Sequence, residues 1–481
     1  MQLQPSPDSQ RPRRSALVTL SLSLLLSSLG ISIANVALPT LATAFAASFQ
    51  QVQWVVLAYL LAVTTIIVSA GRLGDLLGSR RLLLGGIALF TIASALCGLA
   101  PTLWFLIAAR AAQGLGAAIL MALSMAVVSA IVPKERTGSA MGLLGTMSAA
   151  GTALGPSLGG LLIASVGWRA IFFINLPLGA AAFLLAWRSI PLDREQSTVD
   201  RARFDLVGTL LLALTLGAYA VAMTIGRGQF GPLNAALLFA AIAGVVLFVL
   251  AEQRAASPLI RLTMFRERAL SAGFAMSALV TTVVMATLVV GPFYLSGALA
   301  LDAARIGLVM ASGPLVAALS GVPSGRLVDR FGTARMTIAG LIAMAAGSMS
   351  LATIPASYGI PGYVAPLVVI TAGYALFQAA NNTAVMSGLR PDQRGVVSGL
   401  LNLSRNLGLI TGASLMGALF ARAAGATSLA TARADALAAG MRMTFSVAAM
   451  MIVAAIVIAL VSRAPRPRHT RHLRIELRQR R

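Results

Sequence analysis

The sequence predicts an all-α polytopic membrane protein with fourteen transmembrane helices, arranged as two six-helix bundles with two intervening helices. Of the 481 residues, 58% are hydrophobic and only 11% are charged, which is more apolar side chain than a soluble globule of this size can bury. The apolar residues gather in runs of about 20, the length a helix needs to cross a hydrocarbon core about 30 Å thick. A charged motif recurs in both halves of the chain, which indicates a duplicated bundle.

The apolar runs give the candidate spans in order. None has the period of two that marks a barrel strand, and runs such as LSLSLLLSSLGISIANVAL are too long for one. The spans are 15–37, 52–70, 82–100, 103–126, 138–162, 170–188, 205–226, 232–251, 270–296, 305–323, 336–355, 362–385, 396–420 and 440–462. They divide the chain into a tail (1–14), an N-terminal bundle (15–190), a linker region with two extra helices (191–268), a C-terminal bundle (269–462) and a basic tail (463–481).

The formal net charge of +23 is distributed unevenly across the predicted membrane. Most of the 37 basic residues fall in the tails and in the loops on one side, as the positive-inside rule predicts for cytoplasmic segments. We therefore expect a multi-pass protein of the cell (inner) membrane with both termini in the cytoplasm. The basic tail 463–481 is expected to face anionic lipid headgroups. No nucleic-acid partner is expected, and the oligomeric state stays open, with function as a monomer expected.

The repeated motif reads GRLGDLLGSRR at Gly71–Arg81 and GRLVDRFGTAR at Gly325–Arg335. Both copies are predicted in short inner loops, after the second and tenth spans, where glycines permit a tight turn and close helix approach. The acidic residue in each copy, among arginines, predicts a latch that pairs in one conformation and separates in another. A plain basic loop would explain the arginines but neither the repeated Asp nor the glycine spacing. The predicted gate residues are Gly71, Arg72, Asp75, Gly78, Arg80, Arg81, Gly325, Arg326 and Asp329.

Two further motifs lie inside spans of the first bundle. FLIAARAAQGLGAA places Arg110 within the fourth span, with Gln113 on the same helix face, and an unpaired charge there should face a cavity or a partner. GTALGPSLGG in the fifth span combines small residues at four-residue spacing with a proline, which permits close packing and a bend. The alternatives for this span are a general packing seam and a helix that bends between conformations. Its motif residues are Gly151, Gly155, Pro156 and Gly159.

Polar residues within spans are candidates for lining a substrate path, because facing lipid without a partner is costly for them. Two asparagine or glutamine pairs, Gln378 with Asn382 and Asn402 with Asn406, are spaced i and i+4 and share a face; Arg405 lies within the second pair. Each candidate either lines the path or bonds a neighbouring helix. The full set is Asn35, Trp54, Tyr59, Tyr374, Gln378, Asn382, Asn402 and Asn406.

On these motifs the chain resembles a fourteen-helix drug:proton antiporter of the major facilitator superfamily, the multidrug efflux type. Gly71–Arg81 matches that family's signature after helix 2, Arg110–Gly116 its helix 4 signature, and Gly151–Gly160 the signature associated with exporters. The segments GWRAIFFINLPLG and SIANVALPTLA are also typical of the fourteen-helix group. The resemblance covers essentially the whole chain.

The resemblance implies roles for single residues. Asp75 with Arg72 would secure the cytoplasmic gate, Arg110 would take part in proton coupling, and Gly155 with Pro156 would shape the export cycle. One departure matters: relatives often carry an Asp in helix 1 where this chain has Gly30, and none of its 14 acidic residues falls in the middle of a span. A neutral or anionic substrate is therefore favoured over a permanent cation, because Arg110 would attract an anion. Proton coupling would then run through Asp75 near the rim, or through Arg110 with water or substrate.

The predicted function is secondary active export of small amphiphilic compounds, such as drugs, antibiotics or metabolites, by alternating access. The expected energy source is the proton gradient, in an antiport that needs no bound cofactor. The alternative is an uptake symporter for a small organic acid or sugar. The sequence has no GxxxxGKS or GxxxxGKT phosphate-binding loop, no metal-ligand cluster and no Ser/His/Asp set near a cavity, which argues against ATP as direct energy source and against an enzyme. A channel would need a repeated selectivity ring, whereas the two halves are unlike.

Overall fold

The structure, a computed structural model, describes residues 7–131, 137–190, 205–225, 231–255, 267–387, 391–425 and 432–462. Within these ranges the chain is helical and contains no strand, so the all-α prediction is confirmed. The elements are α1 (Pro7–Ala44), α2 (Phe49–Leu77), α3 (Ser79–Leu99), α4 (Leu103–Ile131), α5 (Thr137–Ser165), α6 (Ala170–Phe173), α7 (Asn175–Ser189), α8 (Leu206–Thr224), α9 (Pro232–Arg254), α10 (Arg268–Gly297), α11 (Ala303–Phe331), α12 (Thr333–Thr353), the 3₁₀ turn η3 (Ala356–Tyr358), α13 (Gly359–Met386), α14 (Pro391–Thr411), the π-helical turn η4 (Gly412–Met416), α15 (Gly417–Ala424) and α16 (Ala434–Val461).

Each predicted span coincides with a helix or a continuous run of helices. In the described residues, 13 segments are long and apolar enough to cross a membrane. Among them, α6 with α7 forms a single span at Ala170–Ser189, and α14, η4 and α15 together form the span Leu400–Ala424. The remaining predicted span, 138–162, lies in α5, whose apolar stretch Ala150–Ser165 is shorter. The protein is therefore a polytopic membrane protein of the predicted class.

The twin charged motifs are helical along most of their length, so the prediction of short loops there is wrong. Helix α2 continues to Leu77 and α3 begins at Ser79, which leaves Gly78 alone between them at φ 92°. Gly332 separates α11 from α12 in the same way at φ 82°. The helices extend past the predicted spans because the apolar window marks only their lipid-facing part, whereas the backbone hydrogen bonds continue into the polar region. A glycine can reverse the chain in one residue because it adopts positive φ without a Cβ clash.

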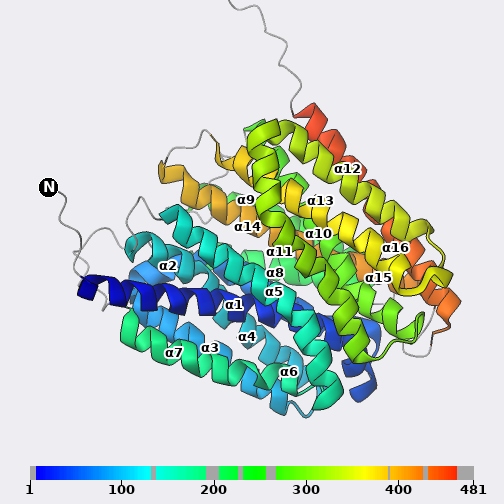
Figure 1. Ribbon diagram of the computed structural model, residues 1–481, viewed down its shortest axis with the longest axis horizontal. Helices are drawn as coiled ribbons and strands as arrows, with labels where there is room; N and C mark the ends of the chain where they lie inside the picture. The colour runs from blue at the N-terminus through cyan, green and yellow to red at the C-terminus, as the bar shows by residue number, and fades with distance from the viewer. Residues whose placement is uncertain are drawn as a thin grey trace, which may run out of the picture.

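The helices form two halves that lie side by side, with α1–α7 in the lower part of Figure 1 and α10–α16 in the upper part. In the first half, α1 packs along α5 and α7, and α4 packs against α2 and α3. In the second half, α13 packs against α11 and α12, α10 packs along α14, and α16 packs against α12. Helices α8 and α9 pack on each other, and α8 also packs on α2.

The two halves meet at the end of the molecule where α2 begins, which we call the Phe49 end. The opposite end carries the Gly78 and Gly332 turns, and we call it the Gly78 end. The ring centroid of Phe49 lies 4.7 Å from that of Phe293 and 6.0 Å from that of Phe420, both in the second half. One buried core cluster joins residues of both halves, whereas a second cluster, nearer the Gly78 end, contains first-half residues alone. The described contacts therefore close the Phe49 end.

A hydrogen bond between the halves reinforces this closure. Gln53 Nε2, one turn into α2, donates to the Ala413 carbonyl oxygen at 2.8 Å. Ala413 belongs to η4, where the wider π-helical turn interrupts the regular ladder of backbone hydrogen bonds. Gly417, the first residue after η4, leaves room for the Gln53 side chain, since a Cβ there would overlap the Gln53 amide.

Helix α8 is bonded to the first half near both of its ends. Ser69 and Thr209 share a hydrogen bond of 3.0 Å between their hydroxyl oxygens, toward the Gly78 end. Trp54 Nε1 donates to the Thr224 hydroxyl at 3.1 Å, toward the Phe49 end. These two bonds align α8 along the length of α2.

The same helix also reaches the second half. Tyr219 lies beside Thr411 and Ser414, at the junction of α14 and η4, and α8 packs against η4. Helix α8 therefore lies beside the line along which α2 meets α14 and η4.

Candidate functional site

Arg110 is the centre of a buried polar network in the first half. Its side chain is 0% exposed, and its Nε donates to the Val55 carbonyl oxygen at 2.9 Å. Its Nη1 donates to the Gly30 carbonyl oxygen at 3.0 Å and to Gln113 Oε1 at 2.5 Å. The guanidinium carbon also lies 4.3 Å above the Tyr59 ring, a cation–π geometry. The prediction that Arg110 meets a cavity or a partner is resolved in favour of partners in this conformation.

The helices approach closely enough for this network because α4 carries glycines just after Arg110. A Cβ on Gly114 would lie 2.5 Å from the Tyr59 carbonyl oxygen, and a Cβ on Gly116 would lie 2.7 Å from the Phe90 nitrogen. Both glycines belong to the Arg110–Gly116 segment that matches the helix 4 signature, although no role for them was predicted. Gln113 extends the network, since its Nε2 donates to the Ser94 hydroxyl at 2.6 Å.

The hydrogen-bond acceptors of Arg110 are all neutral, and one of its donor nitrogens has no described acceptor. Arg110 Nη2 is buried and has no hydrogen-bond partner among the described residues. Gly30 lies directly beside this network: a Cβ there would be 3.3 Å from the Tyr59 hydroxyl oxygen and 3.3 Å from Phe90 Cζ. A short carboxylate at position 30 would therefore enter the surroundings of Arg110, at the cost of small adjustments by two aromatic rings.

The acidic side chains that the structure describes all lie at helix ends, as predicted. Asp205, Glu267 and Asp302 are the N-cap residues of α8, α10 and α11. Asp329 and Glu252 lie in the last turns of α11 and α9, and Asp435 lies in the first turn of α16. Of these, Glu252 is buried and the predicted gate residue Asp329 is exposed. No described carboxylate therefore lies at mid-membrane depth.

The gate motif can be judged in its second copy. Arg326 and Asp329 are exposed, and Asp329 forms no ion pair with any residue whose side chain is described. A Cβ on Gly325 would meet nothing within 4 Å, so this glycine makes no close helix contact here. In the first copy, Arg80 Nη2 donates to the Trp187 carbonyl oxygen at 2.5 Å, and Arg81 is exposed. Gly71 and the side chains of Arg72 and Asp75 lie outside the described part, and the latch stays a prediction.

The glycine seam of α5 packs within its own half. A Cβ on Gly151 would lie 2.5 Å from the Leu25 carbonyl oxygen of α1, and a Cβ on Gly159 would lie 3.0 Å from Ile33 Cγ1. Gly155, between them in α5, lies against Ser32 of α1. Pro156 is buried inside the helix. These motif residues therefore hold α5 against α1.

A neighbouring glycine, which the sequence reasoning did not select, joins α5 to the second half. A Cβ on Gly160 would lie 2.5 Å from the Ala303 carbonyl oxygen and 2.8 Å from Gly307 Cα of α11. Gly307 faces back in the same way, 2.5 Å from the Pro156 carbonyl oxygen and 2.9 Å from Gly160 Cα. The backbones of the two halves are in direct contact here. The pair was not identifiable from the small-residue pattern of either helix alone.

The candidate path residues of the first half are largely occupied by other partners. Asn35 is fully buried, and its Nδ2 donates to the Ile31 carbonyl oxygen of its own helix. Tyr59 is buried under Arg110, and its hydroxyl donates to the Ser27 carbonyl oxygen at 2.9 Å. Trp54 is bonded to α8, as described above. In this conformation Trp54 and Tyr59 bond neighbouring helices, whereas Asn35 bonds within α1.

The candidate path residues of the second half are more accessible. Tyr374, Gln378, Asn382, Asn402 and Asn406 are all partly exposed, on α13 and α14. Arg405 Nη2 donates to Asn382 Oδ1 at 2.5 Å and so connects the two helices. The structure thus brings polar residues of α13 and α14 together, and no hydrogen bond among the described residues joins them to the first-half candidates.

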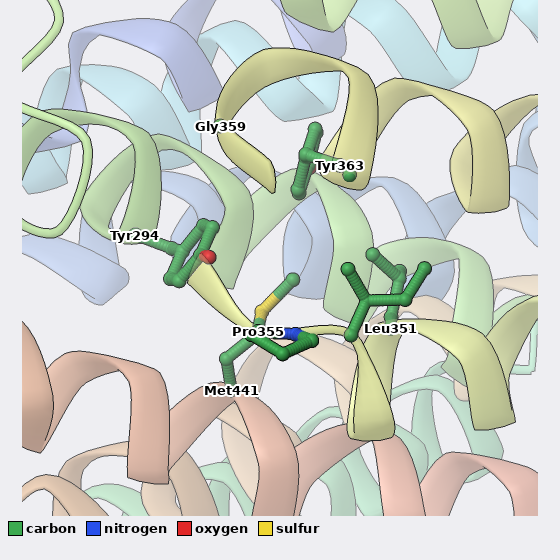
Figure 2. Close-up of a pocket in the computed structure, with 8 residues that line it drawn as sticks. Tyr294, Leu351, Pro355, Gly359, Tyr363 and Met441 are labelled. Atoms are coloured by element: carbon green, nitrogen blue, oxygen red, sulfur yellow. The ribbon is translucent and has the colours of Figure 1, made fainter. Parts of the chain in front are cut away.

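A small pocket lies at the Phe49 end of the second half, with about 230 Å³ of space that includes open solvent. Figure 2 shows the side chains of Tyr294, Leu351, Tyr363 and Met441 gathered around it, and the two tyrosine rings stack with their centroids 6.1 Å apart. Its lining is Tyr294, Leu351, Ile354, Pro355, Gly359, Gly362, Tyr363 and Met441. None of the predicted path residues belongs to this pocket. Among the described residues, no group of three or more His, Cys, Asp or Glu could hold a metal ion.

Comparison with known proteins gives the family and the fold. A model of the Major Facilitator Superfamily matches residues 20–413. The multidrug resistance protein Stp of Mycobacterium tuberculosis (strain CDC 1551 / Oshkosh) is 33% identical over 417 residues, which cover 84% of this chain and 75% of Stp. The riboflavin transporter RibZ of Clostridioides difficile (strain 630) is 31% identical over 409 residues, which cover 84% of this chain and 88% of RibZ.

A solved structure shares the arrangement of helices. A bacterial homologue of the human lysosomal transporter Spinster, in an inward-facing and unoccupied conformation, superposes with a TM-score of 0.68. The match covers 95% of this chain and 98% of that chain at 15% sequence identity. At this sequence identity the likeness shows a shared fold and nothing about substrate or mechanism.

Proposed function

The chain belongs to the Major Facilitator Superfamily, and on this premise we propose that it exports small amphiphilic compounds across the cytoplasmic membrane in exchange for protons. It is a membrane transporter and not an enzyme. Relatives that align with more than four fifths of the chain include a multidrug resistance protein and a riboflavin transporter, and both names support a small organic molecule as substrate.

The observation that carries the transport mechanism is the closure of the molecule at one end. The halves touch through Phe49, Gln53 and the Gly160–Gly307 contact, all toward the Phe49 end. In alternating access, two halves rock around a central path so that it opens to one side at a time. We assign the Gly78 end to the cytoplasm, following the excess of basic residues in the segments on that side. The described conformation would then receive substrate from the cytoplasm.

Arg110 is the candidate for the coupling residue. A buried cation held by neutral acceptors is sensitive to any change in charge or hydration around it, because the surroundings screen it weakly. We propose that a proton or a substrate group reaching this network alters the bonds of Arg110 to α1 and α2, both of which lie near the interface of the halves. The proton gradient is then the energy source, and no bound cofactor is required.

The alternative function, an uptake symporter for a small organic acid or sugar, has the same architecture. The name of the multidrug resistance protein among the relatives favours export. Direction of transport separates the two functions, so the decisive test is made in vesicles whose orientation is known.

The test uses everted membrane vesicles from a pump-deficient bacterium that expresses the chain. Phenylnaphthylamine, a neutral fluorescent amphiphile, is added, and respiration then acidifies the vesicle interior. We expect the dye to accumulate inside only when the gradient is present, and to leave when a protonophore is added. Vesicles from cells without the protein supply the background for passive partition.

An Arg110→Gln variant tests the coupling role in the same vesicles. We expect gradient-driven accumulation to fall by about tenfold or more, because a charge-assisted hydrogen bond contributes about 1.5–3 kcal/mol and several are lost together. Uptake that occurs only in right-side-out vesicles would establish the symporter. Accumulation that persists unchanged after the protonophore would exclude proton exchange while leaving export in place.

A further inference from the structure

Arg405, like Arg110, lies away from the ends of its predicted membrane span, and its surroundings differ from those of Arg110. It is partly exposed, and the hydrogen bond described for it joins Nη2 to the neutral amide oxygen of Asn382. The sequence contains no acidic residue at 330–391 or at 393–434. The nearest one along α14 is Asp392, about 20 Å away along the helix axis. The positive charge of Arg405 therefore has no carboxylate partner from its own helix or from α13.

The polar face of α14 points toward the first half. Further along the same continuous helical run, Ala413 and Gly417 contact Gln53 of α2. Helix α14 itself packs on α2. Asn406 and Ala413 are separated by about two helical turns, so they lie on similar faces. Asn406 is partly exposed because it lies on the Gly78 side of the closure, where the described core clusters of the two halves are separate.

The polar residues of α13 face the same region. Tyr374, Gln378 and Asn382 are spaced i, i+4 and i+8 and are all partly exposed. Thr371, seven residues before Gln378 and on the same face, lies opposite Gly313 of α11, and on the adjoining face Asn381 Nδ2 donates to the Gly273 carbonyl oxygen of α10. Helices α10 and α11 are the ones that pack against α1 and α5 of the first half. The strip is therefore directed at the interface between the halves.

Arg110 and Arg405 differ in how accessible their guanidinium groups are to a ligand. Arg110 is fully buried, with three acceptors and an aromatic ring around its guanidinium. Arg405 keeps part of its surface accessible, and its single described hydrogen bond leaves donors on the other nitrogens for a ligand. A guanidinium binds a carboxylate, sulfonate or phosphate group through two parallel hydrogen bonds, and neighbouring amides add neutral donors.

We propose that Arg405, together with Asn382, Gln378 and Tyr374, forms a recognition site for the acidic group of amphiphilic organic anions. This inference rests on the proposed export function and names a substrate class for it. The negative charge of the ligand would neutralise Arg405, which the neutral amide of Asn382 cannot do. The Tyr374 ring offers an apolar surface to the organic part of the ligand. The rival account is that Arg405 and Asn382 form only a structural hydrogen bond between α13 and α14.

The test compares two fluorescent dyes that share one aromatic skeleton and differ in a sulfonate group. Anilinonaphthalene sulfonate is anionic, and phenylnaphthylamine is neutral. Gradient-driven accumulation of each dye is measured in everted vesicles, and the readout is the ratio of the anionic to the neutral rate. For Arg405→Gln we expect this ratio to fall by about tenfold or more, the effect of losing one charge-assisted contact. Arg433→Gln, at an exposed arginine far along the chain, is the matched control and should keep the wild-type ratio.

Asn382→Asp provides an independent arm that preserves the shape of the side chain. The new carboxylate would pair with Arg405 and compete with the ligand, so the ratio should fall although the arginine is intact. A purely structural role predicts the opposite, because a charged acceptor would strengthen the bond between the helices and leave the ratio unchanged. Size-exclusion profiles of the purified variants in detergent show whether each one is folded.

The outcomes separate this proposal from the proposed function. A ratio that is unchanged in both Arg405→Gln and Asn382→Asp would overturn the anion site. A wild-type protein that accumulates the neutral dye but not the anionic one would also overturn it, while export would stand. A wild-type protein that moves neither dye in a gradient-dependent way would overturn the export function itself.

Discussion

At the residue scale, the partners of Arg110 explain why this position requires arginine. Two of its acceptors are backbone carbonyls, Gly30 O on α1 and Val55 O on α2, which lie in different directions from the guanidinium. The planar fork of arginine donates in several fixed directions at once, whereas lysine has one compact ammonium group. These backbone acceptors tie α4 to α1 and α2 without any acidic side chain. Such partners leave no trace in the sequence, since every residue has a carbonyl.

Gly30→Asp should change the charge preference of the transporter. The new carboxylate would lie beside Tyr59, Phe90 and the guanidinium of Arg110, and would neutralise the buried charge. We expect cells that express the variant to gain resistance to the permanent cation ethidium relative to the wild type. Growth of a pump-deficient bacterium across ethidium concentrations measures this.

Gly30→Asn is the matched control, because it brings nearly the same volume and the same crowding without the charge. A gain of ethidium resistance in both variants would show that space, not charge, sets the preference at this position. Unchanged resistance in Gly30→Asp, with the protein present in the membrane, would contradict the link between position 30 and substrate charge.

At the element scale, α5 uses glycine on two faces for two purposes. Gly151, Gly155 and Gly159 hold it against α1 in its own half, while Gly160 holds it against α11 in the other. The first contact can persist while the halves rock, but the second must separate when the Phe49 end opens. Helix α5 therefore moves as part of the first half and carries one contact of the closure with it.

Within the twin motifs, glycine should be required most strongly at the single-residue turns between long helices. Gly78 has φ 92° and ψ 128°, a region that residues with a Cβ avoid. We expect Gly78→Ala to destabilise the protein by about 1–3 kcal/mol through backbone strain. Thermal unfolding of the purified variant in detergent would show this as a lower midpoint.

Gly325→Ala is the matched control from the second copy of the motif. It lies inside α11, and an added Cβ would meet nothing within 4 Å, so the variant should be neutral or more stable by about 0.5–1 kcal/mol. If Gly78→Ala and Gly325→Ala unfolded at the same temperature, the turn would not be under the steric constraint that its dihedral angles imply.

At the scale of the whole molecule, the glycine contact between α5 and α11 should control which end is open. A leucine side chain at position 160 would overlap the Ala303 carbonyl and the Gly307 backbone. We expect Gly160→Leu to separate the halves at the Phe49 end and to abolish gradient-driven export. Spin labels at Leu99→Cys and Tyr358→Cys, in a Cys97→Ala background, should report longer distances in this variant.

Leu161→Ala provides the control for that measurement, because Leu161 is exposed and lies next to Gly160 in the same helix. It should leave both the label distances and transport at wild-type values. A Gly160→Leu protein with unchanged label distances would show that the closure does not depend on this close contact.

Much of the fold could be predicted from the sequence because each membrane span is a local feature. The apolar runs identified every described membrane helix, Arg110 lies inside one of them, and the acidic side chains that the structure describes lie at helix ends. The contacts between the halves could not be predicted, since Gln53 with Ala413 and Gly160 with Gly307 pair residues that are remote in the chain. The loop prediction at Gly78 failed because hydropathy marks the lipid-facing part of a helix and not its hydrogen-bonded ends.

The bonds of α8 to Trp54 and Ser69, and its packing on η4, give the transporter two unlike flanks. Along one flank, the seam between α2 and α14 is covered by an added helix pair. Along the other, α5 meets α11 backbone to backbone, with no comparable helix pair over it in the described part of the chain. A compound dissolved in the lipid would thus find one side of the protein shielded and the other bare. Accessory helices of this kind would make sideways entry a directional property of the transporter.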